Sequence, residues 1–367
     1  MKIKLYKYEE MLFELLSSSL NKKKANASLF ENITSLEWQK CYHLAQKQGV
    51  LALAWDGVVS LSENTRPPFD IYIKWAADVA EYEERYTRYC STIAELTDFY
   101  ASHGILTMQM KGVGMSTYYP VPEHREGGDI DIFTRSADTL LMSDEEANIL
   151  ADKLIKQQGI EVKRTSYKHS VFRYKGIPVE NHKCYLNVQS VKMSVPIEKE
   201  LKKVDDPVEV SVLNGKYKIN IPNDEFNTLF VSCHAMQHIG SGLCLHHLCD
   251  WACILNKCGM KIPDTLNDRH YVRLLSMFNA FAARFLGCSV TSNCSEKDLD
   301  MFFHVIMRRR TIRKIESRNP LVLLAEKTSR FYHYAFLRKK MLGESISVRM
   351  IKSIIYHIGN PKTLFSN

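Results

Sequence analysis

Two aspartates separated by one apolar residue are the first feature of this chain that points to chemistry. The run Asp129-Ile130-Asp131-Ile132-Phe133 has the alternating polar and apolar pattern of a half-buried β-strand. Side chains at positions i and i+2 of a strand share a face, so the two carboxylates would stand side by side. Neighbouring negative charges repel unless a cation neutralises them, and Mg²⁺ is commonly held by one or two carboxylates together with substrate phosphates. The spacing therefore indicates a metal-dependent nucleotide site.

A glycine-containing turn precedes the aspartates. An apolar, strand-like run at residues 105–110 leads into Lys111-Gly112-Val113-Gly114, and residues 113–119 are predicted to form a short helix. Glycine lets the backbone approach a ligand closely, and the amides at a helix start bind phosphate. We expect Gly112 and Gly114, the Ser116 hydroxyl and the Lys111 ammonium to contact the triphosphate of a nucleotide.

Glu180 supplies a third carboxylate from a separate strand. Three strand-like runs at residues 162–165, 169–174 and 177–182 follow, the last two joined by the hairpin signal Lys175-Gly176. Nucleotidyl transfer with two metal ions uses carboxylates to hold the ions. Taken alone, Glu180 is typical of a surface acid; beside the aspartates it is expected to be a metal ligand or a base. His182 shares its strand face and is expected near the metals.

Several histidines further along the chain have spacings that can bind a transition metal. His234 and His238 lie at i and i+4 of a predicted helix, and Asp250 follows His246-His247 within one turn. No glutamate makes an HExxH arrangement, so we favour a structural role over a separate zinc site. An intermediate interpretation places His234 and His238 in the cleft, in contact with phosphate or acceptor.

Composition restricts the class of protein. The chain has 367 residues, of which 45% are hydrophobic and 25% charged, which is enough for two or three domains with real cores. No apolar run approaches the roughly 18 residues of a membrane-spanning helix. Glu9, Glu10 and Glu14 interrupt the region where a signal peptide would be apolar. Ten scattered cysteines without CxxC pairs favour reduced thiols and a cytoplasmic location.

The predicted elements indicate an α+β protein in three regions. Residues 1–104 are read as helical, with a capping box at Thr34 and Glu37; residues 105–221 form a small mixed-sheet α/β core that ends in an Asn214-Gly215 hairpin; residues 222–367 are helical. Residues 301–367 carry fourteen lysines and arginines against three acidic residues. This basic end fits nucleic acid, anionic lipid or an acidic partner, and equally a solvated helix face.

The motifs together resemble the nucleotidyltransferase superfamily that includes DNA polymerase beta and kanamycin nucleotidyltransferase. More narrowly, they resemble a bacterial family of uncharacterised nucleotidyltransferases, over roughly residues 35–280. The residues that carry the resemblance are Lys111-Gly112, Arg125, Asp129-Ile130-Asp131, Glu180-x-His182 and His234…His238…Asp250. The superfamily's usual turn is Gly-Gly or Gly-Ser followed directly by a helix, and its third acid is more often aspartate; this chain departs from both patterns.

The resemblance implies a small mixed sheet flanked by helices and a Mg²⁺ pair on Asp129, Asp131 and Glu180, with Mn²⁺ as the alternative ion. It also implies that Arg125 belongs to the nucleotide-binding set. We expect transfer of a nucleoside monophosphate from an NTP to an acceptor hydroxyl, with release of pyrophosphate. The alternatives are an inactive nucleotide-binding or interaction protein, and a transferase that modifies RNA or DNA through the basic end.

Overall fold

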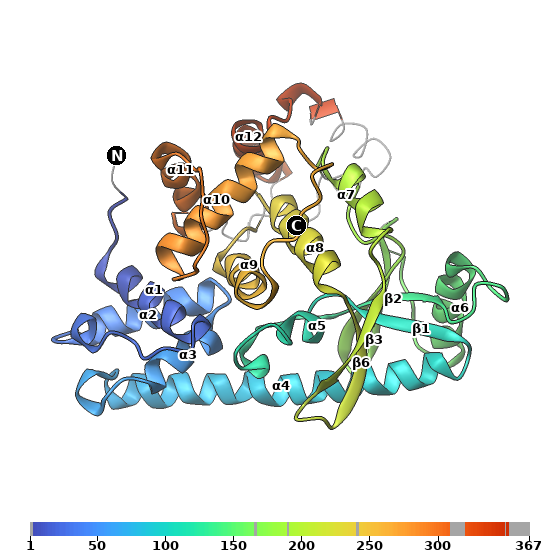
Figure 1. Cartoon of the computed structure of the whole chain (residues 1–367), viewed down its shortest axis with the longest axis horizontal. Helices are drawn as coiled ribbons and strands as arrows, with labels where there is room; N and C mark the ends of the chain where they lie inside the picture. Colours follow the sequence, from blue (N-terminus) through green and yellow to red (C-terminus); the bar gives the residue numbers. More distant parts are fainter. Residues whose placement is uncertain are drawn as a thin grey trace.

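The architecture is seen in a computed structural model of the chain, which describes residues 3–164, 167–188, 191–239, 242–308, 320–348 and 350–351. The strands gather around one end of a long helix, and helices make up most of the remainder (Figure 1). The predicted α+β class with a small mixed sheet is confirmed. The boundaries near residues 104 and 221 stay predictions, because the buried apolar side chains form one continuous cluster from Ile3 to Met341.

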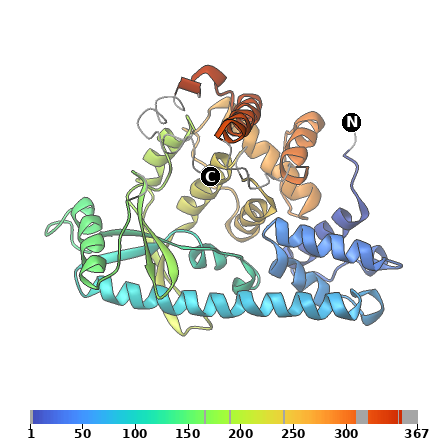
Figure 2. The ribbon, with the colours of Figure 1, turned by 180° about the vertical axis from the view of Figure 1, so that it is seen from behind.

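The N-terminal helices are arranged on the long helix α4 (Phe69–Ala101), which runs along the lower edge of Figures 1 and 2. Three helices lie over its first half: α1 (Lys7–Leu20), α2 (Ser35–Lys47) and α3 (Leu51–Val59). A short 3₁₀ turn at Ala27–Phe30 lies between α1 and α2, and another at Glu63–Thr65 lies between α3 and α4. The predicted capping box is present at the start of α2, where the Glu37 N–H donates to Thr34 Oγ1 (3.2 Å) and the Thr34 N–H donates to Glu37 Oε2 (3.0 Å).

The sheet has four strands in the order β1-β2-β4-β3. These are β1 (Ile105–Gln109), β2 (Ile130–Ser136), β3 (His169–Tyr174) and β4 (Ile177–His182). β2 pairs antiparallel with β1 and parallel with β4, and β3 pairs antiparallel with β4. The segment from β1 to β2 contains α5 (Val113–Ser116) and a 3₁₀ turn, η3 (Pro122–His124). α6 (Asp144–Gln157) follows β2 and packs against it.

The register of β2 against β4 decides which side chains meet. Ile130 lies opposite Val179, and Asp131 lies opposite Glu180. Ile130 is buried, as the predicted alternation requires. Asp129 directly precedes the strand instead of lying within it.

The strand predicted at residues 162–165 is reduced to one bridge between Lys163 and Val171; residue 165 lies outside the described residues.

A second, two-stranded sheet is the hairpin predicted from Asn214-Gly215. It consists of β5 (Pro207–Val212) and β6 (Tyr217–Pro222), and β6 packs against β1 and α4. α7 (Ser194–Leu201) precedes the hairpin. The turn residues Leu213, Asn214 and Gly215 have positive φ angles, which Asn and Gly tolerate best.

The C-terminal helices cover the centre of the molecule. They are α8 (Asp224–Gln237), α9 (Leu245–Cys258), α10 (Arg269–Phe285), α11 (Glu296–Met307) and α12 (Pro320–Leu342). α8 and α9 pack together and lie between the N-terminal helices and the sheet in both views (Figure 1 and Figure 2). Within the described part of the chain, each helix is too short or too polar to cross a membrane.

The contact between α1 and α3 allows the packing of the N-terminal helices to be tested. A Cβ added to Gly57 would lie 2.6 Å from the carbonyl oxygen of Leu15. We expect Gly57→Ala to lower the free energy of unfolding by about 1–3 kcal/mol, measured by urea denaturation. Helix propensity alone predicts the opposite sign, a gain of about 1 kcal/mol. Ala80→Gly, on an exposed face of α4, is the control for propensity and should cost about 1 kcal/mol.

Candidate active site

One cavity of about 290 Å³ contains most of the residues that the sequence singled out. The loops around β1 and β2 contribute Lys111, Gly112, Arg125, Asp129 and Asp131 to its wall. The opposite wall comes from α8 and α9, with His234, His238 and Asp250. Segments more than one hundred residues apart in the sequence therefore meet at this cavity.

Three carboxylates lie together at the two central strands of the sheet, β2 and β4. Asp129, Asp131 and Glu180 each place one oxygen within 4.8 Å of the others. Asp131 Oδ2 is buried and has no hydrogen-bond partner among the described residues. A buried carboxylate oxygen is costly to leave unpaired, and oxygen ligands of this kind suit Mg²⁺. The donor set therefore fits a divalent cation.

Asp131 is the most strongly compensated of the three acids. Lys111 Nζ lies 2.6 Å from Asp131 Oδ1, and His182 Nε2 donates to the same oxygen at 2.9 Å. Burial alone would raise the pKa of Asp131, but Lys111 and His182 outweigh burial and hold the pKa far below its usual range. Burial alone would also lower the pKa of Lys111, and Asp131 and Asp129 raise it instead. Lys111 is thus a charged counter-ion at neutral pH.

The pKa values of the other two carboxylates are shifted in opposite directions. Burial and then the nearby Asp131 carboxylate raise the pKa of Asp129 to about 6. Burial would raise the pKa of Glu180 as well, but a contact with His182 Nε2 at 3.2 Å outweighs it and lowers the pKa.

The predicted glycine turn is present at Gly112 and not at Gly114. Gly112 has φ +53°, and a Cβ there would lie 3.3 Å from the Asp129 carbonyl oxygen, so glycine keeps the two loops close. A Cβ at Gly114 would lie 2.3 Å from the Gln109 carbonyl oxygen, which makes this glycine a packing residue. Ser116 is buried, and its hydroxyl donates to the Val113 carbonyl. The structure does not bring Gly114 or Ser116 to the cavity wall.

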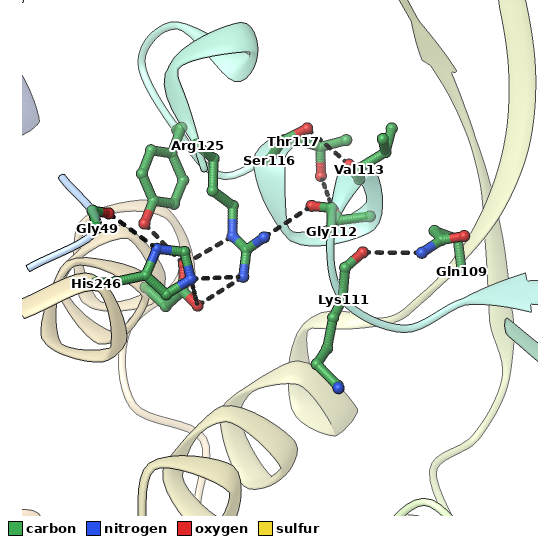
Figure 3. A network of polar contacts seen from close by, with 12 residues as sticks. Gly49, Gln109, Lys111, Gly112, Val113, Ser116, Thr117, Arg125 and His246 are labelled. Atoms are coloured by element: carbon green, nitrogen blue, oxygen red, sulfur yellow. Dashed lines mark hydrogen bonds and ion pairs between the residues drawn. The ribbon is translucent and has the colours of Figure 1, made fainter. Parts of the chain in front are cut away.

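Arg125 lines the cavity, but its guanidinium is engaged by the protein. Nε and Nη2 donate to the two oxygens of Asp250 at 2.8 and 2.9 Å, and Nη1 donates to the Gly112 carbonyl at 3.2 Å. Figure 3 shows Arg125 between Gly112 and His246, with Lys111 extending away from it. Burial alone would raise the pKa of Asp250, but Arg125 lowers it to about 2. Tyr119 also donates to Asp250 (2.7 Å). Arg125 therefore fastens the glycine turn to α9.

The loop that carries the aspartates is held by contacts that sequence reasoning missed. His124 bridges Asp56 on α3 (2.8 Å) and Glu83 on α4 (3.1 Å). The Leu51 N–H at the start of α3 donates to Glu126 Oε1 at 2.5 Å. Tyr89 on α4 donates to the Gly128 carbonyl at 3.1 Å (Oη to O). These partners lie 39 to 75 residues from the loop, so no local sequence signal identifies them.

Two further residues near the carboxylates were also missed. His169 Nδ1, at the start of β3, lies 3.2 Å from Glu180 Oε2. Lys168 precedes it, and burial followed by the positive charge of Lys111 lowers its pKa. The one available signal was the hairpin register, which places His169 opposite His182.

Four histidines gather on the helical wall of the cavity. His234 lies in the last turn of α8, His238 is its C-cap, and His246 and His247 lie in the first turn of α9. His246 has protein partners on both ring nitrogens, the Gly49 carbonyl and Arg125 Nη2, each at 3.3 Å. Burial lowers the pKa of His234 and of His247 well below the usual range, so both rings are neutral at physiological pH.

The basic end is described only in part, because residues 309–319, 349 and 352–367 lie outside the described residues. Two of its arginines are paired within the protein: Arg308 with Glu9, and Arg338 with Glu344 (2.8 Å, Nε to Oε2). These two charges are engaged in internal packing.

The loop contact through His124 has a pH-dependent consequence. Burial alone would lower the pKa of His124, but Asp56 and then Glu83 raise it above the usual value of 6.5. The contact thus contributes stability that is fully present below about pH 6.5 and is lost as the pH rises through the folded-state pKa. We expect the difference in unfolding free energy between wild type and His124→Gln to shrink as the pH rises above about 6.5. A difference that is constant with pH would contradict this assignment.

The Arg125–Asp250 pair is expected to be costly to break. Asp250→Asn leaves a buried guanidinium without its counter-charge, so the free energy of unfolding should fall by about 3–5 kcal/mol. The control is Asp224→Asn on α8, which is more exposed and accepts from Tyr118 Oη (2.7 Å). Its expected cost is below about 2 kcal/mol. If urea denaturation showed the same loss of unfolding free energy for both variants, the buried Arg125–Asp250 pair would contribute no more than the exposed contact of Asp224.

Sequence comparison agrees with this geometry. A family model described as "Uncharacterised nucleotidyltransferase" matches residues 34–287. Neither the curated proteins nor the solved structures contain a match to the chain. The matched region includes the sheet, the three carboxylates, and helices α8 and α9. Because the match covers more than half of the chain, this protein belongs to the uncharacterised nucleotidyltransferase family.

Proposed function

We propose that the chain transfers a nucleoside monophosphate from an NTP to an acceptor hydroxyl and releases pyrophosphate, in the manner of polymerase beta-like nucleotidyltransferases. The observation that carries the proposal is the pairing of β2 with β4. It sets Asp131 opposite Glu180, with Asp129 completing a group of oxygens within 4.8 Å. Asp129 and Asp131 line the cavity, together with Lys111 and Gly112.

The three carboxylates would hold Mg²⁺, with Mn²⁺ as the alternative ion. Bound there, the ion would neutralise negative charge on the phosphates during in-line attack. The orphaned Asp131 Oδ2 and the raised pKa of Asp129 support this assignment. Glu180, whose pKa is lowered, is ionised at neutral pH and suits either a metal ligand or the base for the acceptor proton.

The remaining residues of the site are assigned either to binding the nucleotide or to holding other groups of the site in position. Lys111 and Gly112 are assigned to the triphosphate, because the Lys111 ammonium is charged and Gly112 lines the cavity. Arg125 is assigned as a positioning residue that holds the Gly112 carbonyl against α9. Gly114 and Ser116 are left out of the nucleotide set because their contacts are internal. His182 orients Asp131 and Glu180 through Nε2.

Transfer can be tested with α-labelled nucleotides. The full chain is incubated with each NTP, Mg²⁺ or Mn²⁺, and acceptors of four classes: a sugar, a small metabolite, a protein and an RNA end. We expect label on one acceptor together with pyrophosphate release. Asp131→Asn should lower the rate at least about 100-fold, since the metal contributes several kcal/mol to the transition state. Glu161→Gln, an exposed acid before β3, is the control and should leave the rate unchanged.

Binding is measured separately by the shift in melting temperature with Mg²⁺–NTP. We expect the shift to disappear in the Asp129→Asn, Asp131→Asn double variant. An undiminished shift would show that the metal assignment is wrong. A shift in the wild type without transfer to any acceptor would identify a nucleotide-binding protein. Transfer to RNA that depends on residues 301–367 would identify the nucleic-acid-modifying alternative.

A further inference from the structure

The histidines on the helical wall converge more closely than their positions in the sequence suggest. His234, His238 and His247 each place one ring nitrogen within 4.8 Å of the other two. Their ring centroids are 4.6 Å apart for His234 and His238, 4.8 Å for His238 and His247, and 5.6 Å for His234 and His247. The third ring comes from α9, so helical spacing alone could not place it.

The neighbouring His246 does not belong to this group of three. His246 also lines the cavity, but its two nitrogens are occupied by the Gly49 carbonyl and Arg125. His247 Nδ1 lies 3.4 Å from both the backbone nitrogen and the Sγ of Cys244, which leaves Nε2 as its second nitrogen. The Cys244 N–H donates to His247 Nδ1, so the neutral ring carries its proton on Nε2. Metal binding at Nε2 would move that proton to Nδ1, which can then donate to the Cys244 Sγ and orient the ring.

We propose that His234, His238 and His247 form a binding site for a divalent transition-metal ion of the zinc type, with a fourth position open to the cavity. Nitrogen–zinc bonds of about 2.0–2.1 Å require ligand atoms roughly 3.4 Å apart, so small side-chain rotations close the present arrangement around an ion. Three protein ligands and one open position is the arrangement of zinc sites that also receive water or substrate.

The ligand type distinguishes this site from the carboxylate site. Imidazole suits zinc, copper, nickel and iron, whereas carboxylates suit magnesium and manganese. Two of the nearby cationic side chains are paired, Lys111 with Asp131 and Arg125 with Asp250, so their repulsion of a second cation is reduced. The inference does not depend on the proposed transfer reaction.

The site can be tested on the full chain after its metals are removed with a chelator. Zn²⁺ is titrated calorimetrically in the presence of excess Mg²⁺, which occupies the carboxylates. We expect one equivalent of Zn²⁺ to bind, and the affinity to fall more than about 100-fold in His234→Asn and His247→Asn, since even loss of an outer hydrogen bond costs 10–100-fold. His246→Asn is the matched control and should retain Zn²⁺, as should the Asp129→Asn, Asp131→Asn double variant.

Several results would overturn the inference: no stoichiometric Zn²⁺ in the wild type, loss of Zn²⁺ in the aspartate double variant, or equal loss in His246→Asn.

A ligand exchange keeps the test decisive if the asparagine variants do not fold. Co²⁺ bound to His234→Cys should show a thiolate-to-cobalt charge-transfer band that the wild type lacks. Retention of Co²⁺ by this variant without the band would show that residue 234 is not a ligand. Weaker binding of inorganic phosphate in the histidine variants, with no Zn²⁺ bound by the wild type, would identify an anion site instead.

Discussion

A buried carboxylate must be compensated, and the arrangement around Asp131 follows from that requirement. Asp131 is itself buried, on the face of β2 opposite to Ile130 and Ile132, so its charge is removed from bulk water. Lys111 at the end of β1 and His182 at the end of β4 lie close to one of its oxygens, because β1 and β4 flank β2 in the sheet. The second oxygen and the adjacent Asp129 and Glu180 leave negative charge uncompensated, and a cation can supply the remainder.

The rest of the chain holds these carboxylates in place. The loop before β2 contains two consecutive glycines, Gly127 and Gly128, and would be poorly ordered alone. Contacts from α3, α4 and α9 fasten it through His124, Glu126 and Arg125. This explains why a small sheet is surrounded by so much helix: the helices supply the long-range partners that keep the loop at the carboxylates.

The cavity has two chemically different walls. The sheet side presents hard oxygen donors beside a glycine turn, and the helical side presents neutral imidazoles from the facing ends of α8 and α9. Under the two proposals, the walls would bind different metals, because imidazole and carboxylate ligands select different ions.

The features that the sequence alone determined are local ones: strand faces, turns and hairpins. Alternation in Asp129-Ile130-Asp131 predicted a shared strand face, a glycine turn was predicted at Gly112, and Lys175-Gly176 and Asn214-Gly215 predicted two hairpins that are present. These features depend on backbone geometry over a few residues, which residue type controls directly.

Tertiary structure decided which of those residues face the cavity and which partners they meet. Gly114 and Ser116 have suitable chemistry for phosphate but turn inward against Gln109 and Val113. Arg125 is taken by Asp250, 125 residues away, and His247 joins His234 and His238 only because α8 packs on α9. Such contacts depend on how distant helices pack, and no short stretch of sequence encodes that packing.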